Sequence, residues 1–157
     1  MAEKPIDVVW MELALDEARD ALALDEVPVG AIVVIDEKIV GRGCNRSITD
    51  EDPTAHAEVV ALRDAARAVR NHRLLKATLY VTVEPCVMCA GALVQARIER
   101  LVYGAADPKA GAVDSLFRLC NEPALNHQIE VRGGVLEDKC REMVVSFFRS
   151  KRGAATE

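Results

Sequence analysis

Apolar residues recur along the chain at two different spacings, and the two spacings alternate. Over residues 5–24 they recur at the helical period of 3.6 residues. Residues 29–35 and 38–44 are short apolar runs rich in β-branched side chains, which is typical of strands. Because only Asp36-Glu37 separates these two runs, the pattern predicts a β-hairpin after the first helix.

The same alternation continues through the middle of the chain. A helix is predicted over residues 55–69 with Thr54 as its cap, and it is followed by a strand at 78–83 that is apolar on both faces. A third helix is predicted over residues 86–96, and residues 101–104 form a fourth strand.

The pattern is weaker in the last third of the chain. A short helical piece is predicted near residues 115–120 and an edge strand at 129–131. A terminal helix is indicated by apolar residues that share one face, which are Leu136, Cys140, Met143, Val144, Phe147 and Phe148. Helices that alternate with strands predict a three-layer α/β sandwich.

Length and composition favour one folded domain. The chain has 157 residues, half of them hydrophobic, and because no repeat, low-complexity tract or linker divides it we expect a single domain over residues 1–157. No apolar run reaches the length of about 20 residues that a membrane-spanning helix needs. The first ten residues lack the basic and apolar regions of a secretory signal. We therefore expect a cytoplasmic protein with no membrane partner, in which the five cysteines stay reduced.

Acidic residues are concentrated at the N-terminus. The net charge of −5 argues at first against a nucleic-acid partner, but residues 1–26 carry eight acids and two bases, so the remaining chain is slightly basic. The basic residues that gather next are Arg63, Arg67, Arg70, Arg73 and Lys76. Their spacing is typical of a solvated helix face, and such a face is also a candidate RNA contact, so both interpretations stay open.

Two short motifs carry the candidate chemistry. His56-Ala57-Glu58 lies at the start of the second predicted helix, and Cys86 and Cys89 lie in the first turn of the third. Cysteines three residues apart share a helix face, and a helix N-terminus favours thiolates. One imidazole and two thiolates leave a position open on Zn²⁺ for water, whereas structural zinc sites are usually closed by four protein ligands. The motifs predict a hydrolytic zinc site with Glu58 as the general base.

The main alternative is a structural zinc site in which Cys44 supplies the fourth ligand. A lone Cys-x-x-Cys motif also occurs in redox and structural sites, so the combination of the two motifs carries the hydrolytic interpretation. Cys44, Cys120 and Cys140 are otherwise of the kind that packs as small buried hydrophobic residues.

The sequence resembles the zinc-dependent cytidine/deoxycytidylate deaminase superfamily and, within it, the bacterial tRNA-specific adenosine deaminases. The signature of this superfamily is known, so the roles given below follow from the resemblance. The similar segments are residues 27–31, 44–46, 52–58, 78–82, 84–92, 103–105, 107, 109, 111–112, 115–116, 126–127 and 147–149. The resemblance implies a three-layer α/β/α cytidine-deaminase-like fold with a central mixed five-stranded sheet.

By this resemblance, the reaction is hydrolytic deamination of the wobble adenosine of a tRNA anticodon to inosine. One Zn²⁺ per subunit, held by His56, Cys86 and Cys89, activates a water molecule that attacks C6, and Glu58 transfers the protons. The target base has to be splayed out of its loop, as is usual where proteins read single-stranded RNA. The expected partner is the anticodon loop of tRNA-Arg with an ACG anticodon.

The resemblance also implies contacts to the RNA near the target nucleotide. Asn45 is expected to contact an edge of the flipped base, and the alternative is a turn residue after a strand. Asp107 is expected near the target sugar, where a carboxylate accepts from a 2′-hydroxyl, and the alternative is a residue that only shapes the turn before Pro108.

Further contacts are implied near the terminal helix. Lys109 and Arg149 are expected to meet phosphates, and Phe148 or its neighbour Phe147 to stack on a base, although the apolar stripe alone predicts both rings in the core. Asp114 stands where relatives often have Gly, and residues 153–157 carry no basic side chain, which lowers the local positive charge expected for tRNA binding.

Members of the family usually form homodimers, and the expected contact is the apolar side of the third helix with Val87, Met88 and Leu93. Two other classes of function remain open from the sequence. One is a deaminase of a free base or nucleotide, which releases ammonia from free nucleosides. The other is a noncatalytic zinc module that binds RNA or protein.

Overall fold

The computed structural model describes residues 4–156, with side chains described as far as Gly153. The described residues form five strands, four α-helices and one short 3₁₀ helix, η1. Their order is α1 (Pro5–Ala23), β1 (Gly30–Ile35), β2 (Lys38–Cys44), α2 (Ala57–Val69), β3 (Thr78–Val83), α3 (Val87–Ala96), β4 (Arg100–Ala105), η1 (Leu119–Asn121), β5 (Glu130–Arg132) and α4 (Glu137–Thr156). None of the described helices is long and apolar enough to cross a membrane.

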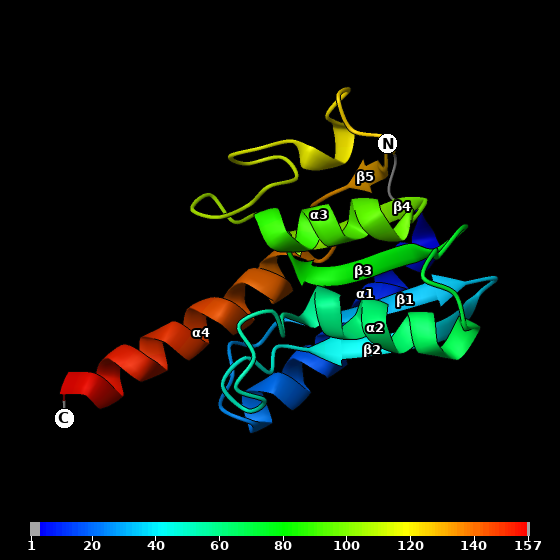
Figure 1. Ribbon diagram of the computed structural model, residues 1–157. Helices are drawn as coiled ribbons and strands as arrows, with labels where there is room; N and C mark the ends of the chain where they lie inside the picture. The colour runs from blue at the N-terminus through cyan, green and yellow to red at the C-terminus, as the bar shows by residue number, and fades with distance from the viewer. Residues whose placement is uncertain (1–3, 157) are drawn as a thin grey trace.

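The strands form one mixed sheet in the order β2-β1-β3-β4-β5. β1 is antiparallel to β2 and β3, whereas β3, β4 and β5 run parallel to one another. One core joins a face of the sheet to α2 and α3, and a second core joins the other face to α1 and α4. Figure 1 shows α2 and α3 in front of the sheet, α1 behind it, and the end of α4 extending beyond the body. The predicted three-layer fold with a mixed five-stranded sheet is therefore confirmed.

The predicted hairpin is confirmed, and its turn has a local cause. Asp36 and Glu37 both adopt positive φ angles, of 50° and 61°. Two consecutive residues in this conformation form the tight turn whose twist matches paired antiparallel strands. Gly43 on β2 is needed for a different reason, because a Cβ there would lie 2.5 Å from the carbonyl oxygen of Ala57. Because position 43 has no Cβ, the start of α2 lies directly on the sheet.

Two local predictions are wrong. Thr54 does not cap α2, because its hydroxyl donates to Asp52 at 2.7 Å and the residue that precedes the helix is His56. The predicted helical piece near residues 115–120 is reduced to η1, which covers 119–121. The backbone N–H groups of residues 113–115 instead donate to the carboxylate of Glu84. A long-range partner has thus replaced local helical hydrogen bonds.

A buried ion pair connects α1 to the amino end of β4. Arg100 donates to both carboxylate oxygens of Asp7, at 2.7 and 2.8 Å, and the hydroxyl of Tyr80 donates to the same carboxylate at 2.8 Å. Asp7 is completely buried and Arg100 is 5% exposed. Such a pair is retained only where its hydrogen bonds are made, as they are here, and it fixes the position of α1 on the sheet.

Candidate functional site

The candidate site lies at the edge where β3 and β4 end. His56 and Cys86 are the residues immediately before α2 and α3, and both have extended backbones. The N–H groups at the start of a helix give it a partial positive charge that favours thiolates. Because His56 and Cys86 directly precede α2 and α3, the N-termini of the two helices bring the His-x-Glu and Cys-x-x-Cys motifs together at this edge of the sheet.

The ligand atoms of His56, Cys86 and Cys89 form a compact group. His56 Nδ1 lies 3.6 Å from Cys86 Sγ and 3.5 Å from Cys89 Sγ. A tetrahedral Zn²⁺ with bonds of about 2.3 Å to sulfur and about 2.0 Å to nitrogen separates N and S by about 3.5 Å. The three side chains thus fit this metal without rearrangement. Cys44 is buried and does not belong to this group.

The two cysteines differ in their electrostatics. Hydrogen bonds from Cys89 and His56 lower the pKa of Cys86 to about 3, so that its thiolate persists at neutral pH. The hydrogen bond to Cys86, together with burial, raises the pKa of Cys89. The hydrogen bond to Cys86 also raises the pKa of His56. The group therefore contains one thiolate, that of Cys86, and retains a proton. A divalent cation that binds the three side chains displaces this proton.

Glu58 lies in the first turn of α2 and is 4% exposed. Burial raises its pKa to about 7, and the negative charge of Cys86 acts in the same direction, against the backbone hydrogen bond and His56. A carboxyl group whose pKa lies near neutrality both accepts and returns a proton readily. This is the property that a general acid–base residue needs.

A pocket of about 230 Å³ is lined by His56, Cys86 and Glu58, and Cys89 is buried behind it. Its other walls are formed by Val27, Val29, Asn45, Val83, Glu84, Asp107, Ala110, Val144 and Phe148. A larger groove, of about 370 Å³, lies between the end of α1 and α4. That groove is lined by no histidine or cysteine among its described residues, so the smaller pocket is the candidate site.

Three of the five predicted RNA-contact residues line this pocket. The side-chain oxygen of Asn45 accepts from Ala57 N–H at 2.8 Å, which leaves its Nδ2 to donate. The carboxylate of Asp107 accepts from the N–H groups of Lys109 and Ala110, so it shapes its turn and also faces the pocket. Phe148 is 43% exposed and forms part of the wall. The apolar stripe wrongly predicted that this ring is buried in the core.

Other candidate residues lie away from the pocket wall. Lys109 is exposed, and Arg149 lies 3.9 Å from Glu142 on α4. Phe147 is 9% exposed, as the apolar stripe predicts. Leu93, which was expected on an exposed face of α3, is completely buried, whereas Val87 is 51% exposed.

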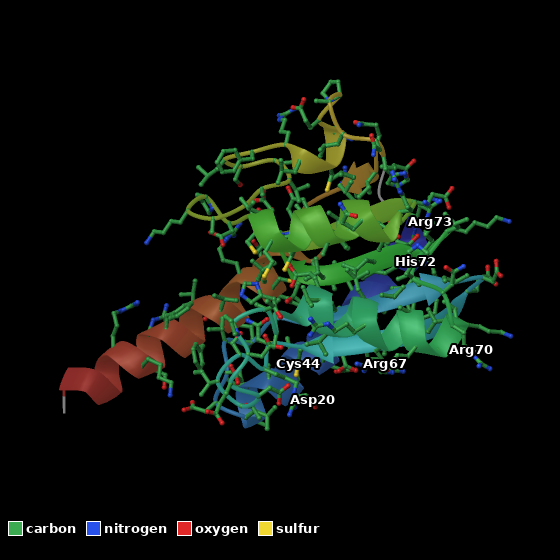
Figure 2. The ribbon with its side chains drawn as sticks, in the orientation of Figure 1. Asp20, Cys44, Arg67, Arg70, His72 and Arg73 are labelled. Atoms are coloured by element: carbon green, nitrogen blue, oxygen red, sulfur yellow. The ribbon has the colours of Figure 1, made fainter. Side chains whose placement is uncertain are left out.

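Arg67 and the later residues of the arginine cluster lie toward the end of α2 that is far from His56, whereas Arg63 lies in the middle of the helix. The helix has 13 residues and therefore spans about 20 Å. Arg67 lies in its last turn, and Arg70 ends it in a left-handed conformation. Figure 2 shows Arg70 and Arg73 at the side of the molecule opposite α4, with Arg67 between them and Cys44 along the lower side. This cluster is not part of the pocket.

Some residues that line the pocket had no predicted role. They are Glu84 and the apolar residues Val27, Val29, Val83 and Ala110. A signal for Glu84 was present, since a carboxylate between an apolar strand and the Pro85-Cys86 pair is out of keeping with its surroundings. Its partners lie more than 20 residues away, and no local spacing reveals them.

A mixed α/β/α sheet that brings a His-x-Glu and a Cys-x-x-Cys motif to adjacent helix N-termini defines a deaminase. The model of the MafB19-like deaminase family matches residues 7–152. The chain is 50% identical over 147 residues to the tRNA-specific adenosine deaminase of Haemophilus influenzae. The aligned region covers 93% of this chain and 85% of that protein. The chain belongs to the family of tRNA-specific adenosine deaminases.

Solved structures agree with this assignment. One, from a study of A-to-I editing by tRNA:A34 deaminases at the wobble position of transfer RNA, is 48% identical with a TM-score of 0.83, over 86% of this chain and 98% of that chain. A guanine deaminase from Nitrosomonas europaea is 24% identical, with a TM-score of 0.77 over 94% of this chain and 86% of that chain. The fold is therefore shared by enzymes that act on different bases.

Proposed function

We propose that this chain deaminates the wobble adenosine of a tRNA anticodon, with water as the second substrate and inosine and ammonia as products. The observation that carries the proposal is a buried Glu58 in the same pocket as His56 and Cys86, two of the three residues of the ligand group. Relatives named tRNA-specific adenosine deaminases, at 41–50% identity, support the choice of tRNA over a free base.

His56, Cys86 and Cys89 hold one Zn²⁺ per subunit in this proposal. When bound at a site with an open position, the metal lowers the pKa of a water ligand to about 7 and so supplies a nucleophile at neutral pH. The N···S distances of 3.5 and 3.6 Å support this assignment. The separation of Cys44 from the group argues against a closed structural site.

Glu58 is the proton-transfer residue. It takes a proton from the attacking water and delivers it to the ring nitrogen beside C6. It then carries a second proton to the departing amine, which leaves as ammonia. A pKa of about 7 supports both directions of transfer.

Asn45, Asp107 and Phe148 bind the flipped nucleotide. Asn45 Nδ2 donates to an acceptor on the base, because its Oδ1 is used by Ala57 N–H. Asp107 accepts from the 2′-hydroxyl of the target sugar, and the exposed ring of Phe148 stacks on a neighbouring base. Lys109 and Arg149 meet phosphates around the pocket mouth.

The finer assignments follow from the same proposal. The substrate is tRNA-Arg with an ACG anticodon, and the protein is a cytoplasmic homodimer of one domain over residues 1–157. The exposed side chains of Val87, Leu116 and Phe117, at 51%, 54% and 53%, support an apolar contact between subunits. Leu93 is no part of that contact, since it is buried within the subunit.

The direct test is incubation of metal-loaded protein with an ACG-anticodon tRNA transcript, followed by reverse transcription and sequencing. The expected result is A read as G at the wobble position only. An unchanged transcript rules out the proposal, and ammonia release from free adenosine or guanine instead assigns the enzyme to small substrates.

A metal measurement on two cysteine variants tests the ligand set separately. Cys86→Ala is expected to lose bound zinc, whereas Cys44→Ala keeps one zinc per chain. Loss of zinc from Cys44→Ala contradicts an open three-ligand site.

A further inference from the structure

Glu84 is a buried carboxylate with an unusually complete set of hydrogen-bond donors. It directly follows β3, precedes Pro85 and Cys86, and is 3% exposed. Its donors, at 2.5–3.1 Å, are the backbone N–H groups of Asp107, Val113, Asp114 and Ser115 and the hydroxyl of Ser115. The negative charge is thus neutralised by five dipoles rather than by a cation.

All five donors come from one loop, residues 106–115, which follows β4. Gly111 brings this loop against the carboxylate, since a Cβ at that position would lie 2.3 Å from the Glu84 carboxyl carbon. Asp107 and Ala110 of the same loop line the pocket. One side chain therefore connects the segment that carries Cys86 to the loop that carries Asp107.

The five hydrogen bonds are divided almost equally between the two carboxylate oxygens of Glu84. Oε1 accepts from Asp107 N–H and the Ser115 hydroxyl, and Oε2 accepts from Val113, Asp114 and Ser115 N–H. An isosteric amide has only one acceptor oxygen, and its NH₂ group turns a donor toward donors. With its nitrogen at the Oε2 position the amide loses three hydrogen bonds, and with its nitrogen at the Oε1 position it loses the bond from Asp107 N–H, because the Ser115 hydroxyl can turn to accept.

Glu26 provides a contrast on the other side of the pocket. It is 2% exposed and holds the loop before α2, but it uses its oxygens unevenly. Oε2 accepts from Thr49 N–H and the Thr49 hydroxyl at 2.6 and 2.7 Å, whereas Oε1 accepts only from Ile48 N–H at 3.3 Å. A glutamine at position 26 keeps both short bonds, so Glu26→Gln is a matched control.

We propose that Glu84 is a positioning residue that holds the 106–115 loop, and with it Asp107, in the conformation that binds RNA. The hydrogen bonds of Glu84 determine how tightly the anticodon loop binds. Their loss does not alter the metal site or proton transfer by Glu58. The RNA part of this inference rests on the proposed function, whereas the part that concerns the loop does not.

The first test is amide hydrogen exchange in the zinc-loaded, full-length protein without RNA. In Glu84→Gln, amides in residues 107–115 are expected to exchange about tenfold faster or more, because each lost bond to a charged acceptor raises the opening equilibrium about tenfold. Glu26→Gln is expected to change exchange in this loop very little. Unchanged exchange of residues 107–115 in Glu84→Gln overturns the proposal, whether or not the protein deaminates tRNA.

The second test separates binding from chemistry with an ACG anticodon stem-loop. Glu84→Gln is expected to raise KM about tenfold, with kcat and zinc content within about twofold of the wild type. A lower kcat or lost zinc at unchanged KM shows that Glu84 acts on the Cys86 segment, which overturns the inference. If wild-type protein leaves the stem-loop unchanged, the proposed function fails while the exchange result still decides the role of Glu84 in the loop.

Ser115→Ala covers the case in which Glu84→Gln fails to fold. It removes only the hydroxyl donor, which is one bond to a charged acceptor, so exchange in residues 113–115 and KM are both expected to rise by up to about tenfold. No change in either quantity overturns the inference.

Discussion

Glu58 and Asp7 are both buried carboxylates, with 4% and 0% of their surface exposed, but their surroundings differ. Glu58 lies beside two cysteines at the edge where β3 and β4 end, and burial raises its pKa to about 7. Asp7 lies at the amino end of β4. Although burial alone raises the pKa of Asp7, hydrogen bonds from Arg100, Lys4 N–H and Tyr80 lower it below its usual value.

The difference lies in what each carboxylate binds. Asp7 accepts hydrogen bonds from a guanidinium, a hydroxyl and a backbone N–H, so its charge is stable and it has no proton to exchange. Glu58 lacks a guanidinium or ammonium partner among the described contacts, and its proton is easily gained and lost. Two carboxylates that are both almost completely buried thus have different roles, one structural and one suited to proton transfer, according to their partners.

The largest expected effect is the loss of catalysis in Glu58→Gln. Removing the proton-transfer group is expected to lower kcat by about 10²–10⁴-fold. Thermal stability is not expected to fall, because the neutral amide costs less to bury than an ionised carboxylate. The measurement is single-turnover deamination of an ACG stem-loop, alongside a melting curve. A stable variant with kcat near the wild-type value contradicts the role given to Glu58.

Asp7→Asn is expected to give the opposite result. It removes the buried one of the two anionic partners of Arg100, which keeps only the partly exposed Glu130 at 2.7 Å, and this is expected to lower the free energy of unfolding by about 3 kcal/mol. At temperatures where the variant is folded, kcat is expected to stay within about twofold of the wild type, because the ion pair lies away from the pocket. Urea unfolding and stem-loop deamination measure the two quantities. A large drop in kcat of the folded variant contradicts the division between the two carboxylates.

The pH dependence of stability sharpens the same contrast. Because the pKa of Asp7 is lowered in the folded protein, its contribution is complete above the unfolded pKa of about 4 and is lost as the pH falls through the folded pKa. The difference in unfolding free energy between wild type and Asp7→Asn is therefore expected to be constant from pH 7 to about 5 and to shrink below about pH 4. Urea titrations at several pH values measure this difference. The contributions of Glu26 and Glu84 to the pH dependence of stability are the same in both proteins and therefore cancel. A difference that grows on acidification contradicts the assignment.

The sequence predicted the parts of the molecule that depend on neighbours along the chain. β2 and β3 have their predicted bounds, since runs of β-branched apolar residues between turn residues decide them. His56, Cys86 and Cys89 were predicted to lie together because helix spacing and two short motifs are local features, and their ligand atoms lie within 4.8 Å of one another. The alternation of elements predicted a three-layer α/β sandwich, whereas the mixed five-stranded sheet was predicted only from the family resemblance.

Two of the errors concern surroundings in space that the neighbouring residues do not reveal. Residues 113–115 are not helical because Glu84, about 30 residues earlier, accepts from their N–H groups. Phe148 has the spacing of a core residue, yet it lies over the open pocket where no other element covers it. Neither outcome is present in the local pattern.

The smallest expected effect, in Tyr80→Phe, divides the Asp7 network into its parts. The variant removes one hydroxyl donor, while Arg100 still donates to both oxygens of Asp7. The unfolding free energy is therefore expected to fall by only about 1 kcal/mol. Urea unfolding measures the change, and the double variant with Asp7→Asn shows whether the two effects add. A loss as large as that of Asp7→Asn means that the hydroxyl, rather than the ion pair, keeps this carboxylate in its structural role.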